Sequence, residues 1–150
     1  MGTITGERTV EIDAPIERVF AIAADVANSP RWQGSLTRAD VVSTDAAGRA
    51  EVVETTSDAK VKSVRAKMRF AYDEPAGMSW DQIEGDTKSA RGWWRFEALD
   101  GDRTRATYGL EVDPGRVLGL LVRGPVQDQV KNMLLGHAAE GLKREAEQAG

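Results

Sequence analysis

His137 is the only histidine in a chain of 150 residues that contains no cysteine. Because the pKa of an imidazole lies near neutrality, His137 could contact a polar group of a ligand or act as a general acid or base. No aspartate or glutamate can be assigned as its partner from the sequence. The alternative interpretation is a core histidine that is hydrogen-bonded to a backbone carbonyl.

The rest of the composition excludes several kinds of site. Without cysteine, disulfides, thiolate chemistry and Cys/His metal centres are ruled out, and we expect neither a metal nor a cofactor. The motifs of phosphate loops, serine hydrolases and zinc proteases are absent from the sequence. A net charge of −4 argues against a nucleic-acid partner. The longest apolar run, Val117 to Val122, is far shorter than the ~20 residues of a membrane span. We therefore expect a soluble, cytoplasmic protein.

His137 lies in the stretch from Pro125 to Gln148, whose spacing predicts one long amphipathic helix. The residues expected on its buried side are Val126, Val130, Met133, Leu134, His137, Ala138 and Gly141. No other helix of similar length is predicted, so this one must pack on a sheet. Gly136 and Gly141 make the helix slim, either for close backbone contact or to leave room for a ligand.

The chain before this helix consists mainly of predicted strands. Arg8 to Ile12 alternates apolar and polar residues, and two short helices follow, one at Ile16 to Ala24 and one that ends near Pro30. From Leu36 onward, turn signals at regular intervals predict six consecutive antiparallel strands. This order indicates an α+β fold in which a curved seven-stranded antiparallel sheet surrounds a long C-terminal helix.

Particular motifs occur in a fixed order along almost the whole chain. They are Ile12 to Phe20, Asp25 followed by Ser29 to Trp32, Met78 to Trp80, Gly92 to Phe96, and Thr104 to Tyr108. Together with the long last helix, this set resembles the START-like (SRPBCC) superfamily, and within it the polyketide cyclase/dehydrase and lipid-transport family. The resemblance implies a single helix-grip domain over residues 1–150, like that of the birch-pollen allergen, with a deep cavity between sheet and helix.

The resemblance also implies which side chains line that cavity. On the strands they are Met68, Phe70, Trp80, Gln82, Trp94, Phe96, Tyr108 and Leu110, and on the long helix Val130, Met133, Leu134 and His137. Such a wall suits a hydrophobic ligand that Gln82 would orient. By composition alone, the same residues also describe an ordinary filled core. Trp32 is expected to be structural, whereas Glu84 and Arg91 are expected at a strand end or on the opposite face.

Two further segments each allow two interpretations. The first is the basic run of Lys60, Lys62, Arg65, Lys67 and Arg69. It could dock an acidic partner or a lipid headgroup, but strand alternation places most of it on the outer face, where charge usually keeps a sheet soluble. The second is Val117 to Val122, which is either a mobile apolar gate over the cavity or a short helix packed in place.

These patterns favour binding or transport of a small hydrophobic or amphipathic ligand, such as a lipid, polyketide or isoprenoid-like molecule. The first alternative is an aromatase or cyclase-type enzyme in which His137, Tyr108 or Gln82 moves a proton. It is disfavoured because the expected pocket offers few acid or base groups. The second alternative is a non-catalytic interaction module, for which the sequence identifies no protein partner.

Overall fold

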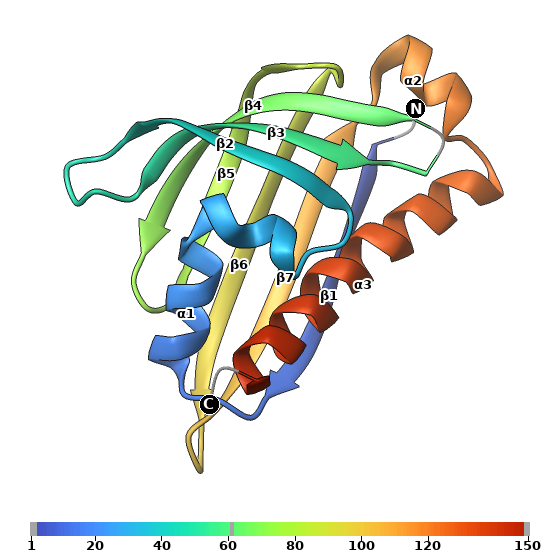
Figure 1. Ribbon diagram of the computed structural model, residues 1–150. Helices are drawn as coiled ribbons and strands as arrows, with labels where there is room; N and C mark the ends of the chain where they lie inside the picture. The colour runs from blue at the N-terminus through green and yellow to red at the C-terminus, as the bar shows by residue number, and fades with distance from the viewer. Residues whose placement is uncertain (1–2, 61, 149–150) are drawn as a thin grey trace.

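The computed structural model describes residues 3–60 and 62–148, which form one curved sheet with helices packed on its inner side (Figure 1). The strands are β1 (Ile4–Ile12), β2 (Leu36–Thr44), β3 (Ala50–Asp58), β4 (Ser63–Asp73), β5 (Gly77–Gly85), β6 (Ser89–Leu99) and β7 (Arg103–Asp113). The helices are α1 (Ile16–Ala24), the 3-10 helix η1 (Val26–Arg31), α2 (Gly115–Leu121) and α3 (Pro125–Gln148). The predicted order of elements is thus confirmed, with α2 as an additional short helix.

The sheet has seven strands in the order β1-β7-β6-β5-β4-β3-β2. Strands β2 to β7 neighbour one another in chain order, and β1 returns to pair antiparallel with β7, from Ile4 opposite Val112 to Ile12 opposite Thr104. Register shifts in the β2–β3 and β4–β5 pairs mark irregularities of the kind that bend a sheet. The curved sheet around α3 confirms the predicted helix-grip fold.

The predicted bounds of the long helix are confirmed, but its predicted buried face is partly wrong. The buried residues of α3 are Val130, Leu135, Ala138, Ala139, Gly141, Leu142 and Ala146. His137 is exposed, and Met133 is only half-buried. The helix packs against α1 and β7 as well as β1. A helix that packs against three elements buries a wider face than one that lies on a single strand. The buried face of α3 therefore includes Leu135 and Leu142, which were not predicted to be buried.

The second half of α3 lies in close contact with the segment that follows η1. A Cβ atom added to Gly141 would lie 2.0 Å from the carbonyl oxygen of Trp32. Trp32 is buried, and its ring centroid lies 6.4 Å from that of Trp94. The structural role predicted for Trp32 agrees with this position. Of the two explanations for a slim helix, close backbone contact applies at Gly141.

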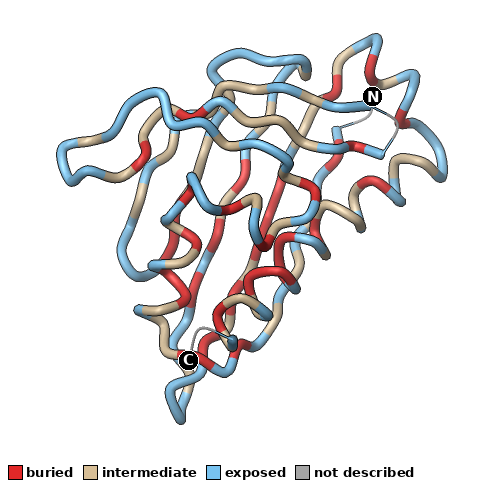
Figure 2. The backbone as a smooth tube through the Cα atoms, viewed as in Figure 1, coloured by how far each residue is buried: buried red, intermediate tan, exposed pale blue. Residues whose placement is uncertain are grey.

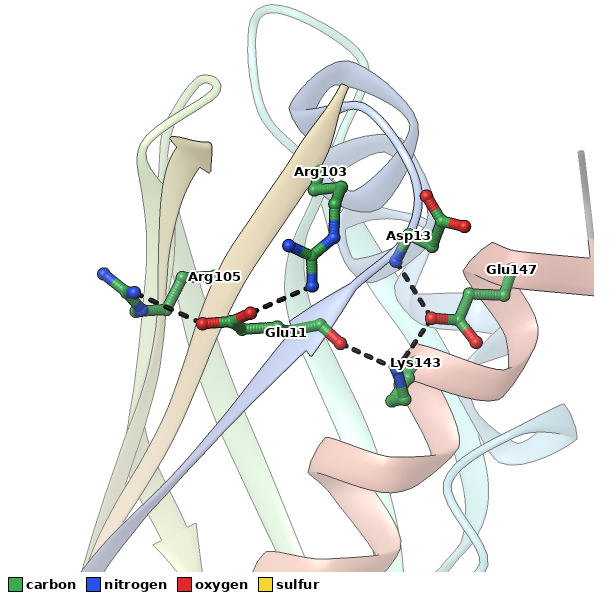
Figure 3. A network of polar contacts seen from close by, with 6 residues as sticks. All are labelled: Glu11, Asp13, Arg103, Arg105, Lys143 and Glu147. Carbon is green, nitrogen blue, oxygen red and sulfur yellow. Dashed lines mark hydrogen bonds and ion pairs between the residues drawn. The ribbon is translucent and has the colours of Figure 1, made fainter. Parts of the chain in front are cut away.

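A network of polar contacts holds the C-terminal end of α3 against β1 and β7 (Figure 3). Its members, here called the C-terminal clasp, are Glu11, Asp13, Arg103, Arg105, Lys143 and Glu147. Lys143 Nζ donates to the backbone oxygen of Glu11 and to Glu147 Oε2, both at 2.7 Å. Glu147 Oε2 also accepts the backbone N–H of Asp13 at 2.9 Å. The hydrogen bond from Lys143 lowers the pKa of Glu147. One carboxylate thus joins the helix to the turn that follows β1.

The opposite end of α3 is less completely covered. Buried residues concentrate in the second half of the helix, whereas the first half is mainly half-buried or exposed (Figure 2). Helix α2 precedes this end, with Leu118 and Val122 buried. Residues 115–121 are therefore helical, and the mobile gate stays a prediction. Among the described residues, no helix has the length and apolar character needed to cross a membrane.

The outer face of β4 carries part of the basic run, but in paired form. Lys67 Nζ lies 3.3 Å from Glu84 Oε2, and Arg69 Nη1 lies 2.9 Å from Glu51 Oε2. Arg65 is exposed on the same strand. The neighbouring carboxylates offset much of the positive charge on this face, which weighs against it as a docking site for an acidic partner.

Candidate ligand-binding cavity

A cavity of about 180 Å³ lies between the inner face of the sheet and the helices. Its wall includes residues of every strand, of the segment around η1, of α2 and of the first half of α3. Nine of the predicted cavity residues line it, namely Met68, Phe70, Trp80, Gln82, Trp94, Tyr108, Leu110, Val130 and Leu134. The other three, Phe96, Met133 and His137, are not part of its wall.

Aromatic rings form a continuous part of the wall across β4, β5, β6 and β7. The ring centroids of Phe70 and Trp80 are 5.4 Å apart, and those of Trp80 and Tyr108 are 5.9 Å apart. Trp94 continues the series at 4.8 Å from Tyr108. A Cβ atom on Gly92 would lie 2.5 Å from the Trp80 ring, so only glycine lets this ring lie flat on the neighbouring strand. The wall therefore presents large apolar surfaces held in fixed positions.

Tyr108 places a polar group within this apolar wall. Its side chain is buried and hydrogen-bonded to Gln33, which also lines the cavity. Burial raises the pKa of Tyr108 to about 12, so the phenol is neutral at physiological pH. Among the described residues, the lining contains no aspartate, glutamate or histidine. The described residues also contain no cluster of carboxylates or histidine that could hold a metal ion.

Gln82 lines the cavity as predicted, but its amide is already engaged. Its Nε2 donates to the backbone oxygen of Thr87 at 2.9 Å, and Thr87 Oγ1 donates to Gln82 Oε1 at 2.7 Å. These contacts make Gln82 a support for the turn between β5 and β6. Glu84 is exposed on the outer face, and the Arg91 guanidinium lies 5.7 Å from the centroid of the Trp93 ring. Arg91 is nevertheless among the residues that line the cavity, whereas Glu84 is not.

His137 does not occupy the position predicted for it. It is exposed on α3, and its Nδ1 lies 2.6 Å from Ser35 Oγ. Ser35 is 2% exposed and lies in the cavity wall. The imidazole therefore contacts Ser35 from the side that faces away from the cavity. The interpretation of His137 as a cavity residue is wrong because α3 is rotated about its axis relative to the predicted face.

Phe96 and Met133 also lie outside the cavity wall. Phe96 is buried farther along β6, where its ring packs edge-to-face on Phe20 of α1 with centroids 6.3 Å apart. Strand alternation correctly predicts that it faces inward, but the space in front of it is filled by α1. Met133 lies on the half-buried flank of α3, for the same reason that His137 is exposed.

Sequence reasoning missed several parts of the wall. Gln33 and Ser35 lie in the irregular segment after η1, where neither periodicity nor a motif indicates which side chains point inward. Leu118 and Val122 were detectable, since they are four residues apart in the apolar run and line the cavity together. A four-residue spacing places two side chains on one helical face.

Several solved structures share this architecture. A START superfamily protein from Mycobacterium smegmatis superposes with a TM-score of 0.85 at 20% identity, over 99% of this chain and 100% of that one. A Thermus thermophilus protein gives 0.82 at 22% identity, over 99% of each chain. An aromatase/cyclase from Streptomyces gives 0.76 at 21% identity, over 98% of this chain and 95% of that one. At these identities the likeness shows the fold alone.

None of the curated proteins matches the chain at a significant level. The family model described as polyketide cyclase / dehydrase and lipid transport matches residues 3–147, which is nearly the whole chain. The matched region contains the whole sheet, the cavity wall and α3 to the C-terminal clasp. The chain therefore belongs to the polyketide cyclase/dehydrase and lipid-transport family.

Proposed function

We propose that the protein binds a small hydrophobic or amphipathic molecule in the cavity and thereby sequesters or carries it. The observation that carries the proposal is a mainly apolar hollow of about 180 Å³, lined by aromatic rings, whose wall includes the buried and neutral hydrogen-bonded pair of Tyr108 and Gln33. An apolar ligand is stabilised there by roughly 25 cal/mol per Å² of surface removed from water. The polar pair then distinguishes one end of the ligand from the other.

The volume of the cavity narrows the class of ligand. An apolar cavity of roughly 150 Å³ admits a benzene-sized molecule, whereas drug-sized ligands occupy roughly 300 Å³ or more. At about 180 Å³, this cavity suits a compact molecule of one or two rings, or a short branched chain. A longer lipid would need the covering helices to move outward. The favoured ligand is thus a small isoprenoid-like or aromatic metabolite with one polar end.

The chemistry of the wall favours binding over catalysis. An aromatase or cyclase-type reaction needs a group that removes a proton near neutral pH. Tyr108, with a pKa of about 12, can donate a hydrogen bond to a carbonyl but is a poor base. His137 is turned toward solvent, and the Gln82 amide is bonded to Thr87. The groups proposed to shuttle a proton are therefore not arranged to do so.

A cavity-filling substitution tests the proposal. Ala66 on β4 faces the cavity, and Ala71 on the same strand is exposed on the outer face. Ala66→Phe should abolish saturable binding of the two-ring fluorophore 1-aminonaphthalene, while Ala71→Phe should leave it unchanged. Energy transfer from Trp80 and Trp94 to the bound fluorophore reports that the probe is inside. The proposal fails if the wild-type protein binds no such probe, or if both variants bind it equally well.

A further inference from the structure

Helix α2 has apolar residues on two sides, although only one side is covered. Leu118 and Val122 face the cavity and are buried. Val117, Leu120 and Leu121 occupy positions i, i+3 and i+4 and therefore share the other side. They are 74%, 62% and 47% exposed. These three residues, called the α2 apolar face, form the densest group of exposed large hydrophobic side chains among the described residues, since Val41, Val42 and Ile83 lie on strands elsewhere.

Cationic side chains surround the α2 apolar face. Arg116 and Arg123 lie at either end of the helix, and both are exposed. Lys88 lies beside its start, since a Cβ atom on Gly115 would be 3.5 Å from the Lys88 Cβ. None of the three forms an ion pair with a described residue, in contrast to the arginines on the outer face of the sheet. The carboxylate of Asp113 accepts the backbone N–H of Gly115 at 2.9 Å and so faces the helix start.

The β3–β4 turn lies at the same end of the sheet. Asp58 pairs with Ser63 at the start of β4, and Ser89 pairs with Asp113 at the end of β7. Because all strands are antiparallel, this register places Lys60 and Lys62 at the end where α2 begins. The exposed apolar helix is therefore at an end that carries Lys60, Lys62, Lys88, Arg116 and Arg123, together with the carboxylates of Asp58, Asp86 and Asp113, each of which accepts a backbone N–H.

We propose that the α2 apolar face and the cations around it dock the protein onto an anionic lipid surface. Apolar side chains bordered by lysine and arginine are the pattern of a helix that lies in the interface of a bilayer with acidic headgroups. The three side chains are largely exposed on one short helix at the end of the sheet, which suits insertion between headgroups. The covered side of the same helix is part of the cavity wall, so docking would bring that wall to the bilayer. This inference rests on the proposed function, because the bilayer is where a hydrophobic ligand would be exchanged.

Backbone geometry gives α2 defined ends. Gly115 and Gly124 bracket the helix with φ angles of +80° and +69°, a region that other residues adopt only with strain. The α3 end next to α2 lacks the close backbone contact at Gly141 and the C-terminal clasp, both of which hold the far end of α3. The α2 end of the cavity wall therefore lies away from the contacts that hold the C-terminal half of α3.

Vesicle co-sedimentation tests the docking surface. The full-length protein should bind phosphatidylcholine vesicles that contain phosphatidylglycerol, bind pure phosphatidylcholine vesicles much more weakly, and dissociate as salt is raised. Leu120→Gln should weaken binding about tenfold, because one leucine side chain no longer enters the interface. Arg123→Glu should weaken it by a similar factor. The matched controls are Val42→Gln, an equally exposed apolar residue on β2, and Arg144→Glu on α3, and both should bind as wild type does.

Four outcomes would overturn the proposal. The first is that the protein does not bind anionic vesicles, whether or not it binds a purified acidic protein instead. The second is equal binding to neutral and anionic vesicles. The third is equal loss in the test and control variants, and the fourth is a dimer that Leu120→Gln dissociates, which would assign the face to a second copy of this chain. Binding of 1-aminonaphthalene to the same protein preparations, measured without vesicles, separates the two proposals. Retained probe binding without vesicle binding refutes docking alone, and vesicle binding without probe binding refutes the cavity function alone.

Discussion

The contact between Gly141 and Trp32 predicts a stability change opposite to the one expected from helix propensity. Alanine is favoured over glycine inside a helix by ~1 kcal/mol, so Gly141→Ala in an isolated helix would be stabilising. In the folded chain the new Cβ would lie 2.0 Å from the Trp32 carbonyl oxygen, whereas such atoms essentially never approach within 3.0 Å. That oxygen belongs to the backbone, so it cannot rotate away. Either α3 or the segment after η1 must move by about 1 Å.

Overpacking of this kind typically costs ~1–3 kcal/mol. We therefore expect Gly141→Ala to lower the free energy of unfolding by ~2 kcal/mol, which corresponds to a fall in Tm of about 6 °C for a chain of this size. The matched control is Gly136→Ala on the same helix. Its Cβ would lie 3.3 Å from Glu140 Oε1, the mobile end of a flexible side chain. Gly136→Ala should therefore raise the free energy of unfolding by ~0.5–1 kcal/mol.

Urea denaturation followed by tryptophan fluorescence and by circular dichroism measures both values. The two signals should give the same midpoint for each variant, as expected for a single cooperative transition. If Gly141→Ala is as stable as the wild-type protein, or gains as much as Gly136→Ala, then α3 does not lie as close to Trp32 as described. The reasoning from backbone contact would then be refuted.

Three further predictions concern ionisation and hydrogen bonding. Burial raises the pKa of Tyr108 and of Tyr72 from 10.0 to about 12, so the stability that the neutral phenols contribute is present below pH 10 and is lost as pH rises through 12. Urea midpoints across this range should fall less steeply in Tyr108→Phe, and tyrosinate absorbance of the wild-type protein should appear only well above pH 10.0. The pKa of Glu147 is lowered in the folded state, so its ionised carboxylate stabilises the fold above pH 4.5, and this contribution is lost as the pH falls through the folded-state pKa. Lys143→Met removes the main cause of the lowered pKa and should make the free energy of unfolding less dependent on pH below 4.5. Gln82→Leu should lower the free energy of unfolding by ~1–2 kcal/mol, as measured by urea denaturation, because the Gln82 amide supports the β5–β6 turn.

Most of the fold is predictable from local patterns. The long helix is bounded by Pro125, which suits a first turn, and by the end of the charged segment at Gln148. Alternation in β4, β6 and β7 correctly assigns inner and outer faces, and five of the nine predicted residues that line the cavity lie on these strands, namely Met68, Phe70, Trp94, Tyr108 and Leu110. These features depend on periodicity and turn chemistry, which are properties of short segments.

The incorrect predictions concern which face of α3 is buried and which side chains of the irregular segments point inward. The adjacent residues Leu134 and Leu135 satisfy a 3.6-residue period equally well, so periodicity does not determine that Leu135 is the more buried of the two. That choice depends on how α3 packs against α1, which is a tertiary contact. The Ser35–His137 hydrogen bond joins residues 102 positions apart through a loop, and no local pattern predicts it.

The two ends of α3 are held in different ways. Small residues at Ala138, Gly141 and Ala146 bring its second half close to its neighbours, and the C-terminal clasp ties that end to the turn after β1. The first half contributes Val130 and Leu134 to the cavity wall. On the proposed binding function, we expect a small tilt of α3 about its clasped end to change the cavity volume most near α2, because displacement grows with distance from the anchor.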